Sequence, residues 1–225
     1  MTRRGDFLEG ARTVVPVLVG VVPFGLVAGA AAVNAGLSPA QAVGLSVIVF
    51  AGAAQLAAIE LLGGGSPLPI VVAIILVINL RMTMYSASIA PHFEGVTARV
   101  RSLVAYVLTD QTYALSVTRF RGSAVSEVAF FLGAALPLWV VWQVCTVVGL
   151  VLGANVPDWL PLEFGVPLTF LALLVPNLED AATGTAAIVG GVVATLAVGV
   201  PFELGLLVGA MSGLVAGFTV EEVGA

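Results

Sequence analysis

Long apolar runs separated by short polar connections make up most of the sequence. Residues 70–78 are nine apolar residues in succession, and with their continuation to residue 90 they reach the ~20 residues that cross a hydrocarbon core of ~30 Å. Comparable runs predict membrane segments over residues 12–34, 40–62, 67–90, 102–118, 126–152, 164–178, 184–200 and 202–218. The pattern therefore predicts an all-α polytopic membrane protein, a bundle of seven or eight membrane segments forming a single integral membrane domain over residues 1–225.

Prolines and small residues predict where these helices are broken. Pro16 and Pro23 interrupt the first segment, and Pro23 is expected to kink it because a proline inside a helix removes one backbone hydrogen bond. The second segment begins after Ser38-Pro39, a favoured helix start, and ends at the glycines of residues 63–65. Its centre around Gly52 is rich in small residues, so this helix is expected to break there.

Glycines at four-residue spacing predict two close helix contacts. Gly25 and Gly29 form one pair in the first segment, and the last segment carries a glycine stripe along one side, at Gly205, Gly209, Gly213 and Gly217. Small residues let helix backbones approach closely in a membrane. We interpret the stripe as packing within this chain, with the docking of a partner subunit as the alternative.

A polar stretch occupies the second half of the third segment. An arginine near the bilayer centre costs about 2.5 to 3.5 kcal/mol even on the lenient insertion scale, so Arg81 should face protein or water and have a partner. Helical spacing places the polar residues on two neighbouring faces, Asn79, Thr83 and Ser86 on one and Arg81, Tyr85 and Ser88 on the other. The alternative is that Arg81 extends to the interface while the hydroxyl groups only join helices.

The fourth segment carries a carboxylate at membrane depth. Asp110 is the only carboxylate well inside a predicted segment, because Glu60 lies near the glycine turn and Glu203 lies at the start of the last segment. Helical spacing again gives two faces, Tyr106, Asp110 and Tyr113 on one and Thr109, Thr112 and Ser116 on the next. An ionisable group at this depth is a functional candidate, and we expect it to pair with Arg81 across the bundle.

Composition narrows the class of function. Of the 225 residues 60% are hydrophobic and 9% charged, far below the ~25% of soluble domains, and the net charge of −5 excludes a nucleic-acid partner. Cys145 is the only cysteine, and the only histidine, His92, is expected to be solvated at the end of a segment. The chain has no lysine, no HExxH and no G-x-S-x-G, so we predict no enzymatic activity, no cofactor and no metal site.

The arginines leave two membrane layouts open. If every segment crosses, Arg99 and Arg101 lie on the side opposite to the other loop arginines, which are Arg3, Arg4, Arg12, Arg119 and Arg121. If the broken second segment and the short fourth segment re-enter on the side that they left, all seven are cytoplasmic, as the positive-inside rule favours.

Four motifs occur in a fixed order along the chain. They are Pro23-Phe24-Gly25, residues 50–55 (FAGAAQ), residues 79–86 (NLRMTMYS) and residues 108–111 (LTDQ). In this order they resemble the AzlC-type branched-chain amino-acid permease family over nearly the whole chain. Met82 and Gln111 depart from the histidine and glutamate that the family often has. The resemblance implies a multi-pass exporter of branched-chain amino acids in the cell inner membrane, usually working with a small AzlD-type membrane subunit.

The residues and the resemblance together predict a secondary transporter that exports branched-chain or similar small apolar amino acids by proton antiport. A zwitterion needs a cation or backbone donors at a broken helix for its carboxylate, and its side chain needs an apolar pocket. The predicted substrate-binding residues are Phe50, Gly52, Gln55, Asn79, Arg81, Thr83, Tyr85, Ser86, Thr109 and Tyr113, with Asp110 as the proton-coupling carboxylate. The alternative is a membrane scaffold or assembly subunit without transport activity.

Overall fold

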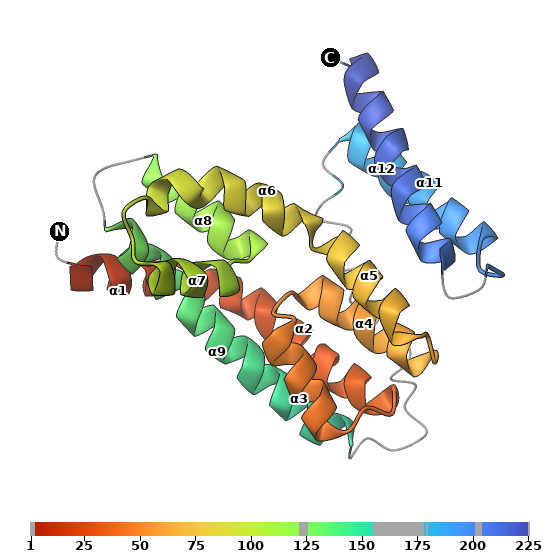
Figure 1. The fold of residues 1–225 in the computed structure, drawn as a ribbon, viewed down its shortest axis with the longest axis horizontal. Helices are drawn as coiled ribbons and strands as arrows, with labels where there is room; N and C mark the ends of the chain where they lie inside the picture. The colour runs from red at the N-terminus through yellow and green to blue at the C-terminus, as the bar shows by residue number, and fades with distance from the viewer. Residues whose placement is uncertain (1–2, 122–125, 155–177, 179, 201–203, 225) are drawn as a thin grey trace.

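The computed structural model describes residues 3–121, 126–154, 178, 180–200 and 204–224, and this part of the chain is all-helical (Figure 1). The predicted segment over residues 164–178 lies almost wholly outside the described residues. The helices are α1 (Arg3–Thr13), α2 (Val15–Asn34), α3 (Pro39–Ile48), α4 (Gly52–Gly63), α5 (Leu68–Ile78), α6 (Leu80–Ile89), the 3₁₀ turn η1 (Ala90–Phe93), α7 (Ala98–Tyr106), α8 (Asp110–Phe120), α9 (Glu127–Gly153), α11 (Ala181–Leu196) and α12 (Leu204–Gly224).

Helix α9 is the longest helix and forms the axis against which α1 and α2 pack in succession (Figure 1). Its 27 residues extend over about 40 Å at ~1.5 Å per residue. Glycines on both helices bring the backbones together: a Cβ atom at Gly29 would overlap the carbonyl oxygen of Thr146, and one at Gly149 would overlap that of Leu26. The close contact predicted from Gly25 and Gly29 is therefore present and joins α2 to α9.

The first predicted segment is divided into two helices. Helix α1 ends at Thr13 and α2 begins at Val15, so Pro16 lies in the first turn of the new helix, where its missing N–H group costs nothing. Helix α2 then continues through Pro23 to Asn34.

The second predicted segment is a hairpin of two short helices rather than one helix. Ser38 caps α3 reciprocally with Gln41, which confirms the predicted start. The chain leaves helical conformation after Ile48, and α4 begins at Gly52, as the small residues there indicated. Gly63, the last residue of α4, lies against Ala35 just before α3, so the hairpin returns to the end of the molecule from which it started.

The fourth predicted segment is also a hairpin, and here the expectation of a single helix over residues 102–118 is wrong. Helix α7 ends at Tyr106 and α8 starts at Asp110, because the Thr109 side chain caps the first turn of α8 through Thr112. Tyr106 consequently does not share a helical face with Asp110. Arg99 lies within α7 rather than in a loop.

The two hairpins enter the molecule from opposite ends. Helix α8 ends at Phe120, whose ring lies 4.8 Å from that of His92 in η1, the turn that precedes α7. Phe120 also contacts Phe130 in the first turns of α9, with ring centroids 6.2 Å apart. At the far end of α9, Gly153 packs against Ala30 in the last turns of α2, close to the start of α3.

Helices α5 and α6 cross between these ends with a single interruption at Asn79, which sequence analysis did not predict. Together with η1 they form one of three stretches long and apolar enough to span a membrane in the described part of the chain, namely Val15–Asn34, Leu68–Phe93 and Glu127–Gly153.

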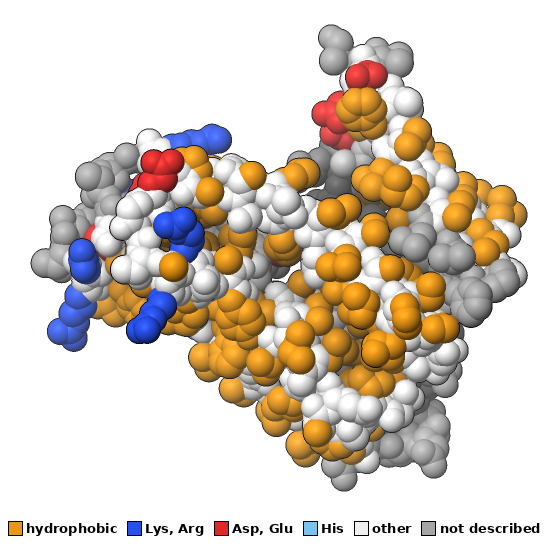
Figure 2. Space-filling view, in the orientation of Figure 1, with side chains coloured by type: hydrophobic (Ala, Val, Ile, Leu, Met, Phe, Trp, Pro, Cys, Tyr) orange, Lys and Arg blue, Asp and Glu red, His pale blue; other side chains and the backbone are white. Residues whose placement is uncertain are grey.

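Seven of the eight arginines lie on α1, on α7 and at the end of α8, and these elements occupy one end of the molecule. Arg119 at the end of α8 is tied to Glu9 of α1 by a 2.7 Å ion pair. On the face shown in Figure 2 the blue side chains all lie at this end. Two hairpins and one arginine-rich end are features of the layout with re-entrant second and fourth segments, and the number of segments that cross the membrane stays a prediction.

Helices α11 and α12 pack against each other through the glycine stripe of α12 (Figure 1). A Cβ atom at Gly209 would lie 2.7 Å from the carbonyl oxygen of Gly190, and one at Gly213 would lie 2.6 Å from that of Ala186. The interpretation that the stripe packs within this chain is confirmed. Asp180 caps the start of α11, and the hydrogen bond from the Thr183 backbone N–H lowers the pKa of its carboxyl group.

We expect Gly29→Ala to destabilise the protein because the added methyl group overlaps backbone atoms of α9, which have little room to shift. Overpacking of this kind costs about 1 to 3 kcal/mol. Gly44→Ala is the matched control, since a Cβ atom at Gly44 in α3 meets nothing within 4 Å. Thermal unfolding in detergent should show a lower midpoint for Gly29→Ala alone, and equal midpoints would contradict the close contact.

Candidate functional site

The interruptions of the helices meet at a cavity of about 550 Å³. It lies between α2, the start of α4, α6, the start of α8 and α9. The lining residues are Val17, Gly20, Val21, Phe24, Phe50, Ala51, Gly52, Ala53, Arg81, Thr109, Asp110, Gln111, Leu138 and Trp142. One side is thus apolar and aromatic, and the other presents two helix N-termini and two charged side chains.

Arg81 and Asp110 form an ion pair in this cavity, with Nη1 and Oδ2 3.6 Å apart. Their side chains are 35% and 41% exposed, which shows that the pair faces the opening rather than a packed core. Arg81 Nε is buried without a hydrogen-bond partner in the described part of the chain. The expected pairing across the bundle is confirmed, and the guanidinium group keeps unused donor capacity.

The N-terminus of α4 is open to the cavity. Ala51 stands at the N-cap position in extended conformation, and no side chain in the described residues caps the helix. The first N–H groups of a helix have no partner within it and carry a partial positive charge. Ala51, Gly52 and Ala53 all line the cavity, so these donors lie beside Arg81.

The N-terminus of α8 is closed by its own side chains. The Thr109 N–H donates to Thr112 Oγ1 at 2.9 Å, and the Thr112 N–H donates to Thr109 Oγ1 at 3.2 Å. Asp110 occupies the first turn of α8, where the helix dipole favours a carboxylate. The two helix starts therefore offer different chemistry, donors at α4 and a carboxylate at α8.

Phe24 and Trp142 form the aromatic side of the cavity. Their rings meet edge to face with centroids 5.4 Å apart. The indole Nε1 of Trp142 donates to Ser46 Oγ at 3.1 Å and to Gln55 Oε1 at 3.2 Å. Gln55 is fully buried behind this ring and does not line the cavity, although the sequence placed it among the substrate-binding residues.

Some of the other predicted site residues line the cavity, and others lie outside it on α6 and α8. Phe50, Gly52 and Thr109 line the cavity with Arg81 and Asp110. Tyr85 stacks on Tyr113 with ring centroids 4.5 Å apart, and the Tyr113 hydroxyl lies 2.9 Å from Ser88 Oγ. The predicted face of Arg81, Tyr85 and Ser88 is thus turned toward α8.

The neighbouring face of α6, which was predicted to hold Asn79, Thr83 and Ser86, does not line the cavity. Thr83 and Ser86 are exposed and line a separate hollow with Ala105 and Leu108 of the second hairpin. Asn79 stands at the interruption between α5 and α6, with Oδ1 buried and without a hydrogen-bond partner in the described part of the chain.

Phe24 and Trp142 line the cavity but were not among the predicted site residues. Phe24 lies in the Pro23-Phe24-Gly25 motif and could have been found there. The sequence indicates a role for Trp142 only weakly, because a tryptophan inside an apolar run needs an acceptor for its N–H group.

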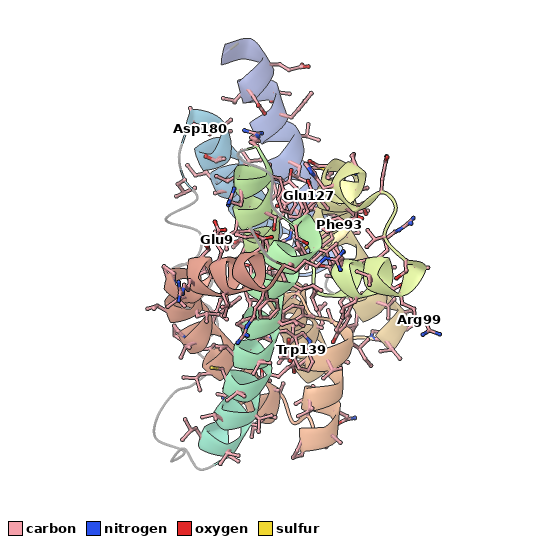
Figure 3. The ribbon with its side chains drawn as sticks, turned by 90° about the vertical axis from the view of Figure 1, so that its left-hand side faces the viewer. Glu9, Phe93, Arg99, Glu127, Trp139 and Asp180 are labelled. Atoms are coloured by element: carbon pink, nitrogen blue, oxygen red, sulfur yellow. The ribbon has the colours of Figure 1, made fainter. Side chains whose placement is uncertain are left out.

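The tips of the two hairpins are joined by Tyr106. Its hydroxyl donates to the carbonyl oxygen of Val47 at 2.8 Å and accepts from Trp139 Nε1 at 3.0 Å. Trp139 is labelled on α9 in Figure 3. Gln143 of α9 donates to the carbonyl oxygen of Ser46 at 3.3 Å. The last carbonyl groups of α3 thus obtain donors from outside their own helix.

The Arg119–Glu9 ion pair and a contact between His92 and Glu127 close the arginine-rich end, where Glu9, Phe93 and Glu127 are labelled in Figure 3. Hydrogen bonding to Glu9 raises the pKa of Arg119 above its usual value. His92 Nδ1 lies 2.6 Å from Glu127 Oε1. The expectation of a solvated histidine is therefore wrong, because the turn η1 brings the half-buried ring against the first residue of α9.

A family model described as AzlC protein matches residues 16–156, more than half of the chain. The chain belongs to the AzlC family. It is 25% identical to the inner membrane protein YgaZ of Escherichia coli K12 over 223 residues, which are 94% of this chain and 91% of that protein. An uncharacterized membrane protein of Archaeoglobus fulgidus is 31% identical over 198 residues, 86% of this chain and 85% of its own length. No solved structure matches the chain.

The AzlC match contains the whole cavity, since every lining residue falls between Val17 and Trp142. Helices α11 and α12 lie beyond it. The four motifs that carried the resemblance each contribute at least one residue to the cavity wall, Phe24, Phe50, Arg81 and Asp110 among them. Their convergence indicates that the motifs belong to one site of this AzlC protein rather than to separate packing contacts.

We expect Arg81→Ala and Asp110→Ala to be non-additive in stability, because each leaves the other charge without its partner. Contacting residues show coupling energies of about 0.5 to 3 kcal/mol, and the opening of this pair to the cavity keeps it below the cost of breaking a fully buried pair. The measurement is a double-mutant cycle by thermal unfolding. Arg99→Ala with Asp110→Ala is the control cycle, since Arg99 is exposed on α7, and additivity in both cycles would show that the pair contributes nothing.

Proposed function

We propose that the protein is a secondary transporter that exports branched-chain or similarly small apolar amino acids across the inner membrane, and that the cavity is its substrate site. One observation carries the proposal: the uncapped N-terminus of α4, a guanidinium group, a carboxylate and an aromatic wall all line the same cavity. A zwitterion with an apolar side chain is complementary to these four features.

The carboxylate of the substrate would bind between the start of α4 and Arg81. Unpaired N–H groups at a helix N-terminus bind anions, and transporters use broken helices near the bilayer midplane in this way. The N-terminus of α8 is less suited to this role, because Thr109 Oγ1 already accepts the Thr112 N–H and the carboxylate of Asp110 stands in the first turn.

The ammonium group would bind Asp110. Arg81 and Asp110 pair with each other in the structure, so a substrate that inserts between them would replace one ion pair by two and leave no charge unpaired. Protonation of Asp110 would remove the partner of the ammonium group, so a proton and an amino acid would occupy the site in alternation. This alternation is what a proton antiporter requires.

The available energy is sufficient for export. One charge moving through 100 mV yields about 2.3 kcal/mol, and each tenfold gradient of substrate costs about 1.4 kcal/mol. One proton per amino acid would therefore sustain a gradient of about fiftyfold.

The order of the helices supports a transporter. The chain runs as helix, broken hairpin and helix twice, as α2 to α5 and as α6 to α9, with the two hairpins entering from opposite ends. Inverted repeats whose broken helices meet at a central site are typical of secondary transporters. We assign the arginine-rich end to the cytoplasm by the positive-inside rule.

Substrate recognition is tested by counterflow of labelled valine in proteoliposomes, with and without a small AzlD-type subunit. We expect counterflow with the wild type and loss of most of it in Arg81→Gln, because the substrate carboxylate loses a charged donor. Arg99→Gln is the control and should behave as the wild type. Absence of counterflow under both conditions, for every amino acid tried, would favour the scaffold or assembly role.

Proton coupling is tested with Asp110→Asn, which cannot take up or release a proton. We expect valine exchange to persist at a reduced rate while accumulation no longer responds to a pH gradient. Glu60→Gln, an exposed carboxylate of α4, serves as the control and should keep the response. Undiminished proton-driven accumulation by Asp110→Asn would overturn the coupling role.

A further inference from the structure

Trp142 is held more firmly than a side chain that only fills space. It is 4% exposed, its N–H group is shared between Ser46 Oγ and Gln55 Oε1, and the ring of Phe24 meets it edge to face. Two acceptors from the first hairpin and one ring from α2 therefore fix the position of an indole that belongs to α9. Its remaining surface forms part of the cavity wall.

The aromatic wall begins directly beside the start of α4. A Cβ atom at Gly52 would lie 2.5 Å from Phe24 Cε1 and 2.9 Å from Trp142 Cη2, so both ring tips touch the glycine. Gly52 is also the first residue of the helix end to which we assign the substrate carboxylate. The distance from that carboxylate to the wall is then short enough for the substrate side chain to reach the rings.

We propose that Trp142, positioned by Ser46 and Gln55, sets the upper size limit of the substrate side chain, with Gly52 leaving the room that the ring tips need. This inference rests on the proposed function, since it concerns the same cavity. The hydrogen bonds matter because a wall discriminates by size only if it cannot move aside. A difference of one methylene group in such a pocket is worth about 10- to 200-fold in selectivity.

The test is competition against labelled valine counterflow by alanine, leucine and phenylalanine. Trp142→Phe makes the wall smaller and removes the N–H anchor, so phenylalanine should improve as a competitor relative to alanine by about tenfold or more. Gly52→Ala should act in the opposite direction, because the new methyl group pushes both ring tips into the cavity, and leucine should weaken relative to alanine.

Trp139→Phe is the matched control. Trp139 lies on the same helix and also donates a hydrogen bond, but it does not line the cavity, so its competition profile should equal that of the wild type. The ratio between competitors is the readout, because a purely structural defect lowers all rates together and leaves the ratio unchanged.

The outcomes separate the two claims. Wild-type counterflow with unchanged ratios in Trp142→Phe and Gly52→Ala overturns the size limit and leaves the proposed function standing. If the wild type shows counterflow with none of the amino acids, the proposed function itself is overturned. If Trp142→Phe does not reach the membrane, the test rests on Gly52→Ala. Weaker competition by leucine relative to alanine then supports the inference, and an unchanged ratio overturns it.

Discussion

In hydrocarbon each backbone group without a hydrogen bond costs several kcal/mol, so the breaks in the two hairpins require donors and acceptors from elsewhere in the protein. Tyr106 and Gln143 supply donors to Val47 and Ser46 at the end of α3, and Thr109 with Thr112 closes the start of α8. The start of α4 is left without such compensation in the described residues. The uncapped start of α4 is the feature on which the proposed binding site depends.

Local patterns in the sequence predicted those parts of the fold that depend on neighbouring residues. The start at Ser38, the break before Gly52 and the face shared by Arg81 and Tyr85 follow from capping, small residues and helical spacing, and the structure has all three. The break before Asp110 was missed because Tyr106, Asp110 and Tyr113 fit an unbroken helix equally well. Only the Thr109 cap, a weak signal by itself, distinguishes the two conformations.

The site was harder to predict because its residues come from five elements. The pairing of Arg81 with Asp110 could be predicted from the cost of charge in lipid alone. The sequence could not predict that Trp142 lines the cavity while Gln55 does not. Both are polar groups in apolar runs, and the sequence does not say which one faces the cavity. The structure places the indole in front and the amide behind it, because the larger group fills the space between α2 and α4.

The glycine contacts between α2 and α9 also bear on how the protein changes shape. Backbones that touch without intervening side chains cannot slide past each other, so α2 and α9 should behave as one rigid frame. For the proposed transport, access to the two sides would then alternate by movement of the hairpins against that frame. The hydrogen bond from the Tyr106 hydroxyl group to the carbonyl oxygen of Val47 joins the hairpin tips, and a neutral hydrogen bond of this kind is weak enough to break and reform during such a movement.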